Sequence, residues 1–205
     1  MNIILASASP RRKELLSQIG IAFQVRVSDV EEKVTTTVPH LLVQELSRQK
    51  AEAVLAVLPE QEGDVIVIGA DTVVACDGRI LGKPGTEEKA IEMLSLLEGR
   101  AHEVYTGVTL LRRMVRRENA EGAAEGTLGY RTERKSFYEA TTVHFCHMSR
   151  REIIDYVTTK DPMDKAGAYG IQGLCARYIS GIEGDYNNVV GLPVSRLYQE
   201  MKDWI

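Results

Sequence analysis

The sequence has few cysteines, no long apolar run and no excess of basic residues. Its three cysteines, Cys76, Cys146 and Cys175, are widely spaced without a C-x-x-C pair, which argues against a disulfide framework or a zinc site. No stretch approaches the roughly 20 apolar residues of a membrane span, and the first residues lack the apolar region of a signal peptide. A formal net charge of -4 argues against a general nucleic-acid binder. We therefore expect a cytoplasmic protein that binds neither nucleic acid nor membrane.

The length and composition indicate one globular domain over residues 1–205. The 44% of hydrophobic and 26% of charged residues are ordinary for a globular protein. One segment differs from the rest, because residues 112–135 are rich in Glu, Gly and Arg and contain few large apolar side chains. We predict an extended hairpin tip or a mobile loop in this segment.

A nearly unbroken apolar run at residues 65–74 predicts a strand that is buried on both faces. Asp71 lies within this run, so its carboxyl group must be protonated, be paired or hold a cation. A carboxylate bonded to loop amides is the alternative that needs no ligand. Gly69 and Ala70 remove side-chain bulk where a ligand could approach the backbone. An Asp-Gly turn after the run predicts a return strand that brings Lys83 towards Asp71.

The first helix is predicted to begin with a basic turn. After a short apolar strand at residues 2–6, a Ser-Pro pair marks the start of a helix. Arg11, Arg12 and Lys13 then lie at the positive end of the helix dipole, where Asp or Glu would be more stable. Helix amides and forked Arg donors suit a phosphate group. We therefore favour a polyanion site over a solvated basic turn that pairs with a neighbouring glutamate.

Three further polar residues could reach the same ligand. Glu31 follows a predicted strand at residues 23–27, and it is a solvated loop residue unless that strand runs beside the Asp71 strand. In that case two carboxylates could hold Mg²⁺ against a triphosphate. Lys50 falls on the apolar face of a predicted helix, where snorkelling and phosphate binding both stay open. Gln172 lies in a glycine-containing loop and could read a base edge, although glycine spacing alone is weak evidence.

Taken in order, these motifs make the sequence resemble the Maf-type nucleoside triphosphate pyrophosphatases. The resemblance covers nearly the whole chain, through LASASPRR at 5–12, VEE at 30–32, QKA at 49–51, GADT at 69–72, GKP at 82–84, DKAGAYGIQG at 164–173 and VGLP at 190–193. It implies a Maf/ITPase-like mixed α/β fold, with an elongated curved β-sheet flanked by helices and two lobes around a deep cleft. It also implies a homodimer, and cleavage between the α- and β-phosphates with a divalent cation, Mg²⁺ or Mn²⁺.

Within this family, the chain resembles the branch that acts on dTTP and UTP rather than the branch that acts on 7-methyl-GTP. The resemblance names Asp71 as the proton acceptor, while the residues alone do not separate water activation from metal binding. The segment at 112–135 is longer than the usual hairpin of the family. The predicted site comprises Asp71, Lys83 and Lys50 as catalytic residues, Ser7, Arg11, Arg12, Thr72 and Gln172 as substrate-binding residues, and Glu31 with Asp71 as metal ligands.

We therefore predict a pyrophosphatase that hydrolyses dTTP and UTP, with a house-cleaning role in nucleotide metabolism. Its physiological substrate could be a modified pyrimidine triphosphate such as 5-methyl-UTP or pseudo-UTP. The alternative is a non-catalytic nucleotide-binding regulator linked to cell division, but a sensor does not need a water-activating carboxylate such as Asp71 together with Glu31. Phosphoryl or nucleotidyl transfer would need a second acceptor site, which no motif supplies.

Overall fold

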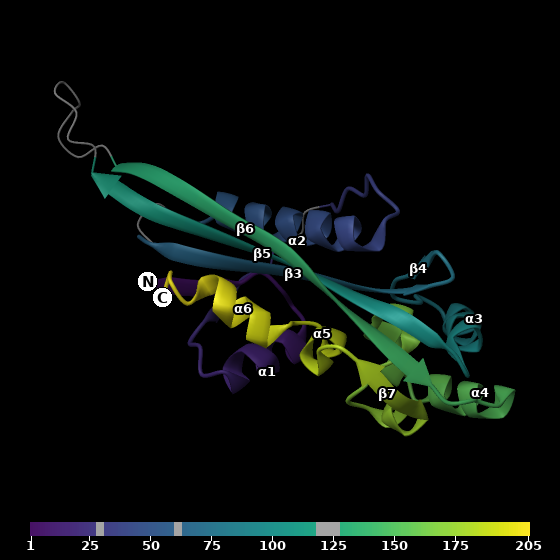
Figure 1. The fold of residues 1–205 in the computed structure, drawn as a ribbon. Helices are drawn as coiled ribbons and strands as arrows, with labels where there is room; N and C mark the ends of the chain where they lie inside the picture. The colour runs from purple at the N-terminus through teal and green to yellow at the C-terminus, as the bar shows by residue number, and fades with distance from the viewer. Residues whose placement is uncertain (28–30, 60–62, 118–127) are drawn as a thin grey trace.

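A twisted mixed sheet forms the centre of the molecule (Figure 1). The structure, a computed structural model, describes residues 1–27, 31–59, 63–117 and 128–205. Within these residues the sheet has seven strands in the order β2-β1-β3-β5-β6-β7, with β4 paired to β3. β1 runs parallel to its neighbours β2 and β3, and all other pairs are antiparallel. The strands are β1 (Asn2–Leu5), β2 (Gln24–Val25), β3 (Val65–Cys76), β4 (Arg79–Leu81), β5 (Ala101–Arg117), β6 (Leu128–Phe145) and β7 (Ile179–Glu183).

Helices cover both faces and one end of this sheet. α2 (Pro39–Ala56) lies on one face, and α1 (Pro10–Gln18), α5 (Tyr186–Val190) and α6 (Val194–Met201) lie on the other (Figure 1). The far end carries α3 (Glu87–Leu97), α4 (Arg150–Thr158) and the 3₁₀ turns η2 (Asp161–Asp164), η3 (Ala166–Ala168) and η4 (Leu174–Tyr178). The predicted mixed α/β fold with an elongated curved sheet flanked by helices is confirmed. Among the described residues, no helix combines the length and the apolar character needed to cross a membrane.

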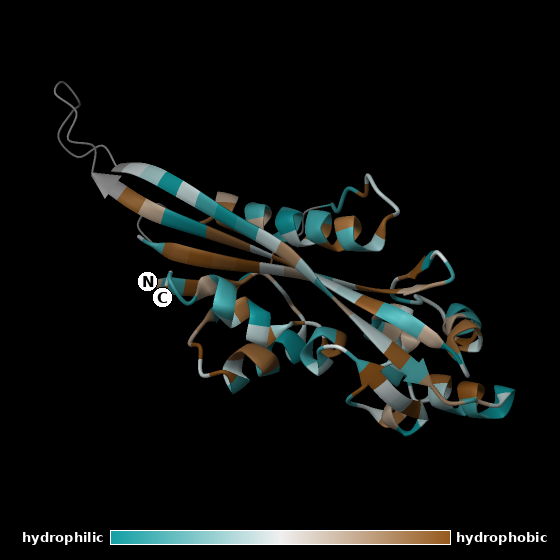
Figure 2. Cartoon of the chain, viewed as in Figure 1, coloured by the Kyte–Doolittle hydropathy of each residue, from teal (hydrophilic) through white to brown (hydrophobic). Residues whose placement is uncertain are grey.

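β3 is the buried strand that the sequence predicts. Every residue of β3 is buried except Asp71 and Thr72, which are half-buried. Ile66 and Ile68 pack beneath α1 and α6 on one face, while Val67 packs beneath α2 on the other. Figure 2 shows the hydrophobic residues of β3 in brown. The polar pair therefore interrupts a strand that is otherwise entirely inside the core.

Two glycines allow α2 to lie directly on the sheet. A Cβ atom at Gly69 would lie 2.2 Å from the carbonyl oxygen of Ser47, and one at Gly107 would lie 2.3 Å from the carbonyl oxygen of Val43. Gly107 is the partner of Asp71 on β5, so the helix also lies close to the sheet beside the acidic residue. The space that the sequence predicts for a ligand at Gly69 is thus filled by the helix backbone, because a glycine also permits close helix–sheet packing.

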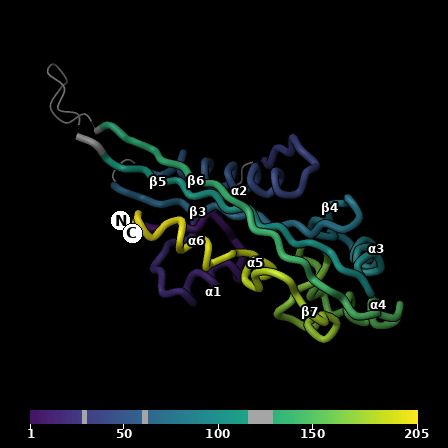
Figure 3. Tube along the Cα trace, viewed as in Figure 1, coloured from purple at the N-terminus to yellow at the C-terminus, as the bar shows by residue number. Residues whose placement is uncertain are grey.

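The sequence predicts an extended hairpin tip or a mobile loop at residues 112–135, and the described part of this segment forms the extended hairpin. All of this segment except residues 118–127 belongs to β5 and β6, whose residues pair in one continuous register with Arg112 opposite Glu133. Figure 3 traces these two strands along the whole length of the molecule. Residues 118–127 lie outside the described residues.

Arg113 shows how an arginine is accommodated in this hairpin. Its side chain is buried, its guanidinium lies 5.2 Å from the centre of the Tyr130 ring, and it donates hydrogen bonds to the carbonyls of Leu58 and Pro59. Arginine can pack its apolar stem along a strand while its head finds hydrogen-bond acceptors. An arginine-rich stretch can therefore be a regular strand rather than a loop.

Candidate active site

A cavity of about 810 Å³ lies beside the half-buried pair on β3. Its walls come from the β1–α1 loop, the first turn of α1, one side of α2, the segment after β4 and the glycine loop at residues 164–173. Eight of the predicted site residues line it: Ser7, Arg11, Arg12, Lys50, Asp71, Thr72, Lys83 and Gln172. Residues that are far apart in the sequence are therefore brought to one cavity.

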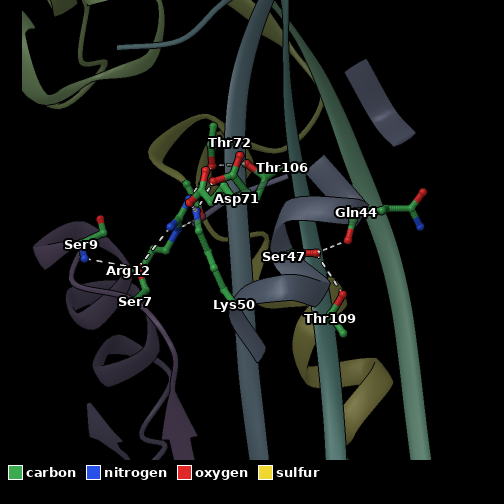
Figure 4. Close-up of polar contacts among 12 residues, drawn as sticks. Ser7, Ser9, Arg12, Gln44, Ser47, Lys50, Asp71, Thr72, Thr106 and Thr109 are labelled. Atoms are coloured by element: carbon green, nitrogen blue, oxygen red, sulfur yellow. Dashed lines mark hydrogen bonds and ion pairs between the residues drawn. The ribbon is translucent and has the colours of Figure 1, made fainter. Parts of the chain in front are cut away.

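Arg12 joins three segments of the chain at the base of this cavity. Its Nε donates to the Gly191 carbonyl at 2.8 Å, one terminal nitrogen donates to Ser7 Oγ at 3.1 Å, and the other donates to Thr72 Oγ1 at 3.0 Å (Figure 4). Thr72 Oγ1 is also hydrogen-bonded to Thr106 Oγ1 at 2.9 Å. Desolvation by burial lowers the pKa of the Arg12 guanidinium, and the charge of nearby Asp71 opposes this shift. Arg12 is thus a fixed positive charge at the start of a helix whose first turn has no acidic residue.

The position of Lys50 decides between the alternatives that the sequence leaves open for Asp71 and for Lys50 itself. Its ammonium extends from α2 to the Asp71 carboxylate and forms an ion pair with it (Figure 4). The Asp71 side chain is only 14% exposed, and this contact supplies the partner that a carboxylate needs there. Lys50 also lies 3.0 Å from Glu32 Oε1. Lys50 therefore lies between two carboxylates instead of snorkelling to the protein surface.

Glu32, rather than Glu31, is the second carboxylate of this cluster. Glu31 is exposed and does not line the cavity, whereas the next residue does. The sequence predicts a ligand role for Glu31 only if the strand before it runs beside the Asp71 strand. That strand, β2, does not neighbour β3, because β1 lies between them in the sheet. The role of Glu31 as a metal ligand stays a prediction without support from its position. The sequence holds both carboxylates in one motif but does not show which of them turns inward.

Lys83 reaches the cavity through the predicted β3–β4 turn. Asp77 and Gly78 both have positive φ angles, of 49° and 73°, and the turn returns the chain so that Leu81 pairs with Val74. Lys83 follows this strand and is exposed at the cavity wall. The Gly167 N–H donates to the Gly82 carbonyl at 3.1 Å, which ties the glycine loop to the same segment.

A second set of ion pairs, which the sequence does not predict, joins the first turn of α1 to the start of the glycine loop at the cavity wall. Arg11 donates to Asp164 Oδ2 at 3.0 Å, and Lys165 donates to Asp164 Oδ1 at 2.8 Å and to Asp161 Oδ1 at 3.0 Å. Asp161 in turn accepts a hydrogen bond from Tyr156 Oη at 2.7 Å. Burial by itself would raise the pKa of Asp164, but the hydrogen bonds from Lys165 and Arg11 outweigh it and lower that pKa.

A signal for these residues is present in the sequence. Asp164 and Lys165 begin the long motif that also contains Gln172, but a charged pair before a glycine loop is usually solvated, so nothing in the spacing singles them out. Their role depends on Arg11, which lies 153 residues away in the chain. Only the folded chain shows that contact.

The described residues contain no cluster of three or more His, Cys, Asp and Glu side chains that could hold a metal ion by themselves. Two carboxylates of the cavity, those of Asp71 and Glu32, both contact the Lys50 ammonium. A cation, the Lys50 ammonium, therefore lies between the two carboxylates. Oxygen donors of this kind suit a hard divalent cation that is completed by water and phosphate oxygens.

The chain is similar over nearly its whole length to curated bacterial proteins named dTTP/UTP pyrophosphatase. The protein from Agathobacter rectalis is 52% identical over 209 residues, covering 98% of this chain and 96% of the relative. The protein from Carboxydothermus hydrogenoformans is 48% identical and covers 100% and 99% of the two chains, and that from Lachnoclostridium phytofermentans is 47% identical and covers 98% and 93%. The family model described as Maf-like protein matches residues 2–204. This chain therefore belongs to the Maf-like protein family.

Proposed function

We propose that this protein hydrolyses dTTP and UTP to the nucleoside monophosphate and pyrophosphate. The observation that carries the proposal is the charge arrangement of the cavity, where Arg11, Arg12, Lys50 and Lys83 line the same cavity as the carboxylate of Asp71. Four cations suit the charge of a triphosphate, and a carboxylate among them suits the activation of water. Relatives that are 47% to 52% identical carry the name dTTP/UTP pyrophosphatase.

The proposed reaction is an in-line attack of water on the α-phosphorus. Asp71 accepts a proton from this water, and the cations stabilise the negative charge of the triphosphate and of the pyrophosphate leaving group. Lys50 exchanges its ion pairs with Asp71 and Glu32 for contacts with phosphate oxygens, which frees the Asp71 carboxylate. Arg12 keeps its fixed position because its three nitrogens are already bonded to protein oxygens.

The proposal includes a divalent cation, Mg²⁺ or Mn²⁺, held by Asp71 and Glu32. The fit rests on the two carboxylates that share the Lys50 ammonium, because a position that accepts one cation between two oxygen donors suits another. When bound, such a cation neutralises phosphate charge and polarises the scissile phosphoanhydride. Two carboxylates leave room for water and phosphate oxygens in the coordination sphere.

Arg11, Thr72 and Gln172 are the proposed determinants of the pyrimidine preference. Thr72 has a fixed orientation, because its hydroxyl is bonded to both Arg12 and Thr106. Gln172 is exposed on the cavity wall, where its side-chain amide offers both a donor and an acceptor to a base. A panel of natural and modified triphosphates, including 5-methyl-UTP and pseudo-UTP, identifies the preferred base.

The direct test is incubation with dTTP or UTP and either metal, followed by analysis of the products. We expect monophosphate and pyrophosphate, and orthophosphate as the only inorganic product would exclude this chemistry. In ¹⁸O-labelled water the label should appear in the monophosphate, because water attacks the α-phosphorus. Thermal stabilisation by dTTP without product on prolonged incubation would favour the nucleotide-binding regulator instead.

Asp71→Asn is the first variant to test, since it removes the proton acceptor and keeps the size of the side chain. We expect loss of turnover by at least about 100-fold, the usual contribution of a general base, with the fold retained. Circular dichroism and the urea midpoint serve as controls for the fold. Turnover close to that of the unmodified protein would contradict the assignment of Asp71.

The proposal extends to the state and place in which the enzyme works. The family resemblance suggests a homodimer, which light scattering tests through a mass twice that of one chain. Because nucleoside triphosphates are cytoplasmic metabolites, we place the activity in the cytoplasm, and fractionation of cells tests that placement.

A further inference from the structure

One edge of β3 is unpaired over residues 69–73, beside the cavity. β1 pairs with β3 as far as Leu5 opposite Ile68, and β4 begins to pair at Leu81 opposite Val74. Between these points no strand of the described residues lies against this edge, while β5 covers the opposite edge without a break. Asp71 is at the middle of this gap.

The hydrogen-bond pattern determines which main-chain groups point into the gap. The Ile68 carbonyl accepts from the Ala6 N–H at 2.8 Å, so the main-chain groups of Ile68 point away from β5. Successive residues of a strand direct these groups to opposite edges, and the β3–β5 register has no shift. The main-chain groups of Ala70 and Thr72 therefore point into the gap, whereas those of Asp71 point towards β5.

Two of these groups lie on either side of Asp71 and have no partner in the part of the chain that the structure describes. Within the described residues, no hydrogen bond of the structure reaches the Ala70 carbonyl or the Thr72 N–H from this edge. Main-chain groups within a core strand almost always have partners, so these two have to be satisfied by something that enters the cavity. The Thr72 hydroxyl is not free to act as their hydrogen-bond partner, because it is already bonded to Arg12 and Thr106.

Building on the pyrophosphatase function proposed above, we infer that this strand edge is part of the catalytic centre. The Thr72 N–H donates a hydrogen bond to a non-bridging oxygen of the α-phosphate. The Ala70 carbonyl accepts a hydrogen bond from the attacking water. The substrate thus fills the place of the missing strand between β1 and β4.

In the hydrolysis step, the Thr72 N–H acts as a hydrogen-bond donor and the Ala70 carbonyl acts as an acceptor. The attacking water has two protons: one passes to the Asp71 carboxylate as the bond from oxygen to the α-phosphorus forms, and the Ala70 carbonyl holds the other. This leaves the lone pair of the water oxygen directed at the phosphorus. The bond from the α-phosphorus to the bridging oxygen breaks, and its electron pair leaves with the pyrophosphate. The Thr72 N–H stabilises the charge on the α-phosphate oxygens, as an oxyanion-hole amide does.

The test removes the Thr72 N–H by replacing Thr72 with its α-hydroxy acid, so that an ester takes the place of the amide between Asp71 and Thr72. The side-chain hydroxyl stays in place. We expect the kcat for dTTP to fall by about 100-fold, as it does when one oxyanion donor is lost. The matched control is the same replacement at Val67, whose N–H points towards β5, away from the cavity. This control should be less stable and keep its kcat.

A second measurement needs no variant. In hydrogen exchange of the unmodified protein, the Thr72 amide should exchange rapidly although it lies in a core strand, while those of Asp71 and Val73 exchange slowly. Binding of α,β-methylene-dTTP should protect the Thr72 amide. An ester variant with the kcat of the unmodified protein, or a Thr72 amide already protected without ligand, would overturn the inference. If the unmodified protein does not hydrolyse dTTP at all, the proposed function fails instead.

Discussion

At the scale of single residues, the site depends on which of two adjacent carboxylates faces the cavity. Glu32 lies 3.0 Å from the Lys50 ammonium, while Glu31 is exposed outside the cavity. We expect Glu32→Gln to weaken metal-dependent turnover by about 10- to 100-fold, and Glu31→Gln to change it less than about twofold. Initial rates over a series of Mg²⁺ concentrations measure both variants. The opposite ranking would return the metal-ligand role to Glu31.

His102 is a buried residue outside the cavity cluster that sets a pH dependence of stability. Its Nε2 is 2.8 Å from Tyr169 Oη, and its Nδ1 is buried without a partner among the described residues. Burial first, and then the charge of His144, lower the pKa of His102 from 6.5 to about 4. The folded protein therefore holds a neutral imidazole at a pH where the unfolded chain has already bound a proton.

This lowered pKa predicts a loss of stability in mild acid. The stabilising contribution of His102 is fully present above pH 6.5 and is lost as the pH falls from 6.5 to about 4. Over the whole interval it amounts to about 3 kcal/mol of unfolding free energy. Urea denaturation at a series of pH values measures it, and His102→Gln should flatten the curve in this interval. An equal slope in both proteins would show that other groups cause the acid sensitivity.

At the scale of elements, the contact of α2 with β3 and β5 brings Lys50 to Asp71. Ser47 and Thr109 are hydrogen-bonded at 2.9 Å in this interface, one helical turn from Lys50 (Figure 4). A side chain at Gly69 would meet the helix backbone at 2.2 Å, so the helix would have to move outward. The position of Lys50 thus depends on the absence of a side chain on the strand beneath its helix.

Gly69→Ala should therefore affect stability and activity together. We expect the free energy of unfolding to fall by about 1–3 kcal/mol, the usual effect of overpacking, and kcat to fall because Lys50 moves away from Asp71. Gly181→Ala is the matched control, since a Cβ at Gly181 has no heavy atom within 4 Å. Denaturant titration and steady-state kinetics test both variants. A Gly69→Ala protein with normal stability would contradict this packing argument.

The sequence predicts elements well where one local pattern determines them. The apolar run of β3, the Ser-Pro start of α1 and the Asp-Gly turn before β4 are such patterns, and all three are confirmed. For the arginine-rich part of β5 and β6 the sequence leaves an extended hairpin and a mobile loop open, because its side chains find partners on distant segments that the sequence does not show. Lys50 was ambiguous for the same reason, since the sequence does not show that two glycines place its helix against Asp71.

At the scale of the whole molecule, the cavity lies between the N-terminal helix α1 and the segments at the far end of the sheet. The ion pair between Arg11 and Asp164 joins these two parts across the cavity. Two more cations are neutralised in the same way: Lys50 pairs with Asp71, and Lys165 pairs with Asp161 and Asp164. Much of the positive charge of the cavity is thus paired with carboxylates of the chain itself, and a triphosphate has to compete with these carboxylates.

This competition predicts the effect of removing the charge that holds Arg11. Asp164→Asn should lower the KM for dTTP by about two- to fivefold, because an exposed ion pair of this kind contributes about 0.2–1 kcal/mol that the substrate otherwise displaces. The salt dependence of KM should remain, since Arg11 keeps its charge. Asp155→Asn, which removes an exposed carboxylate near Arg151 on α4, is the matched control and should leave KM unchanged. A raised KM in Asp164→Asn would mean that this carboxylate instead orients Arg11 for the substrate, and the two halves of the cavity would then be assembled before binding.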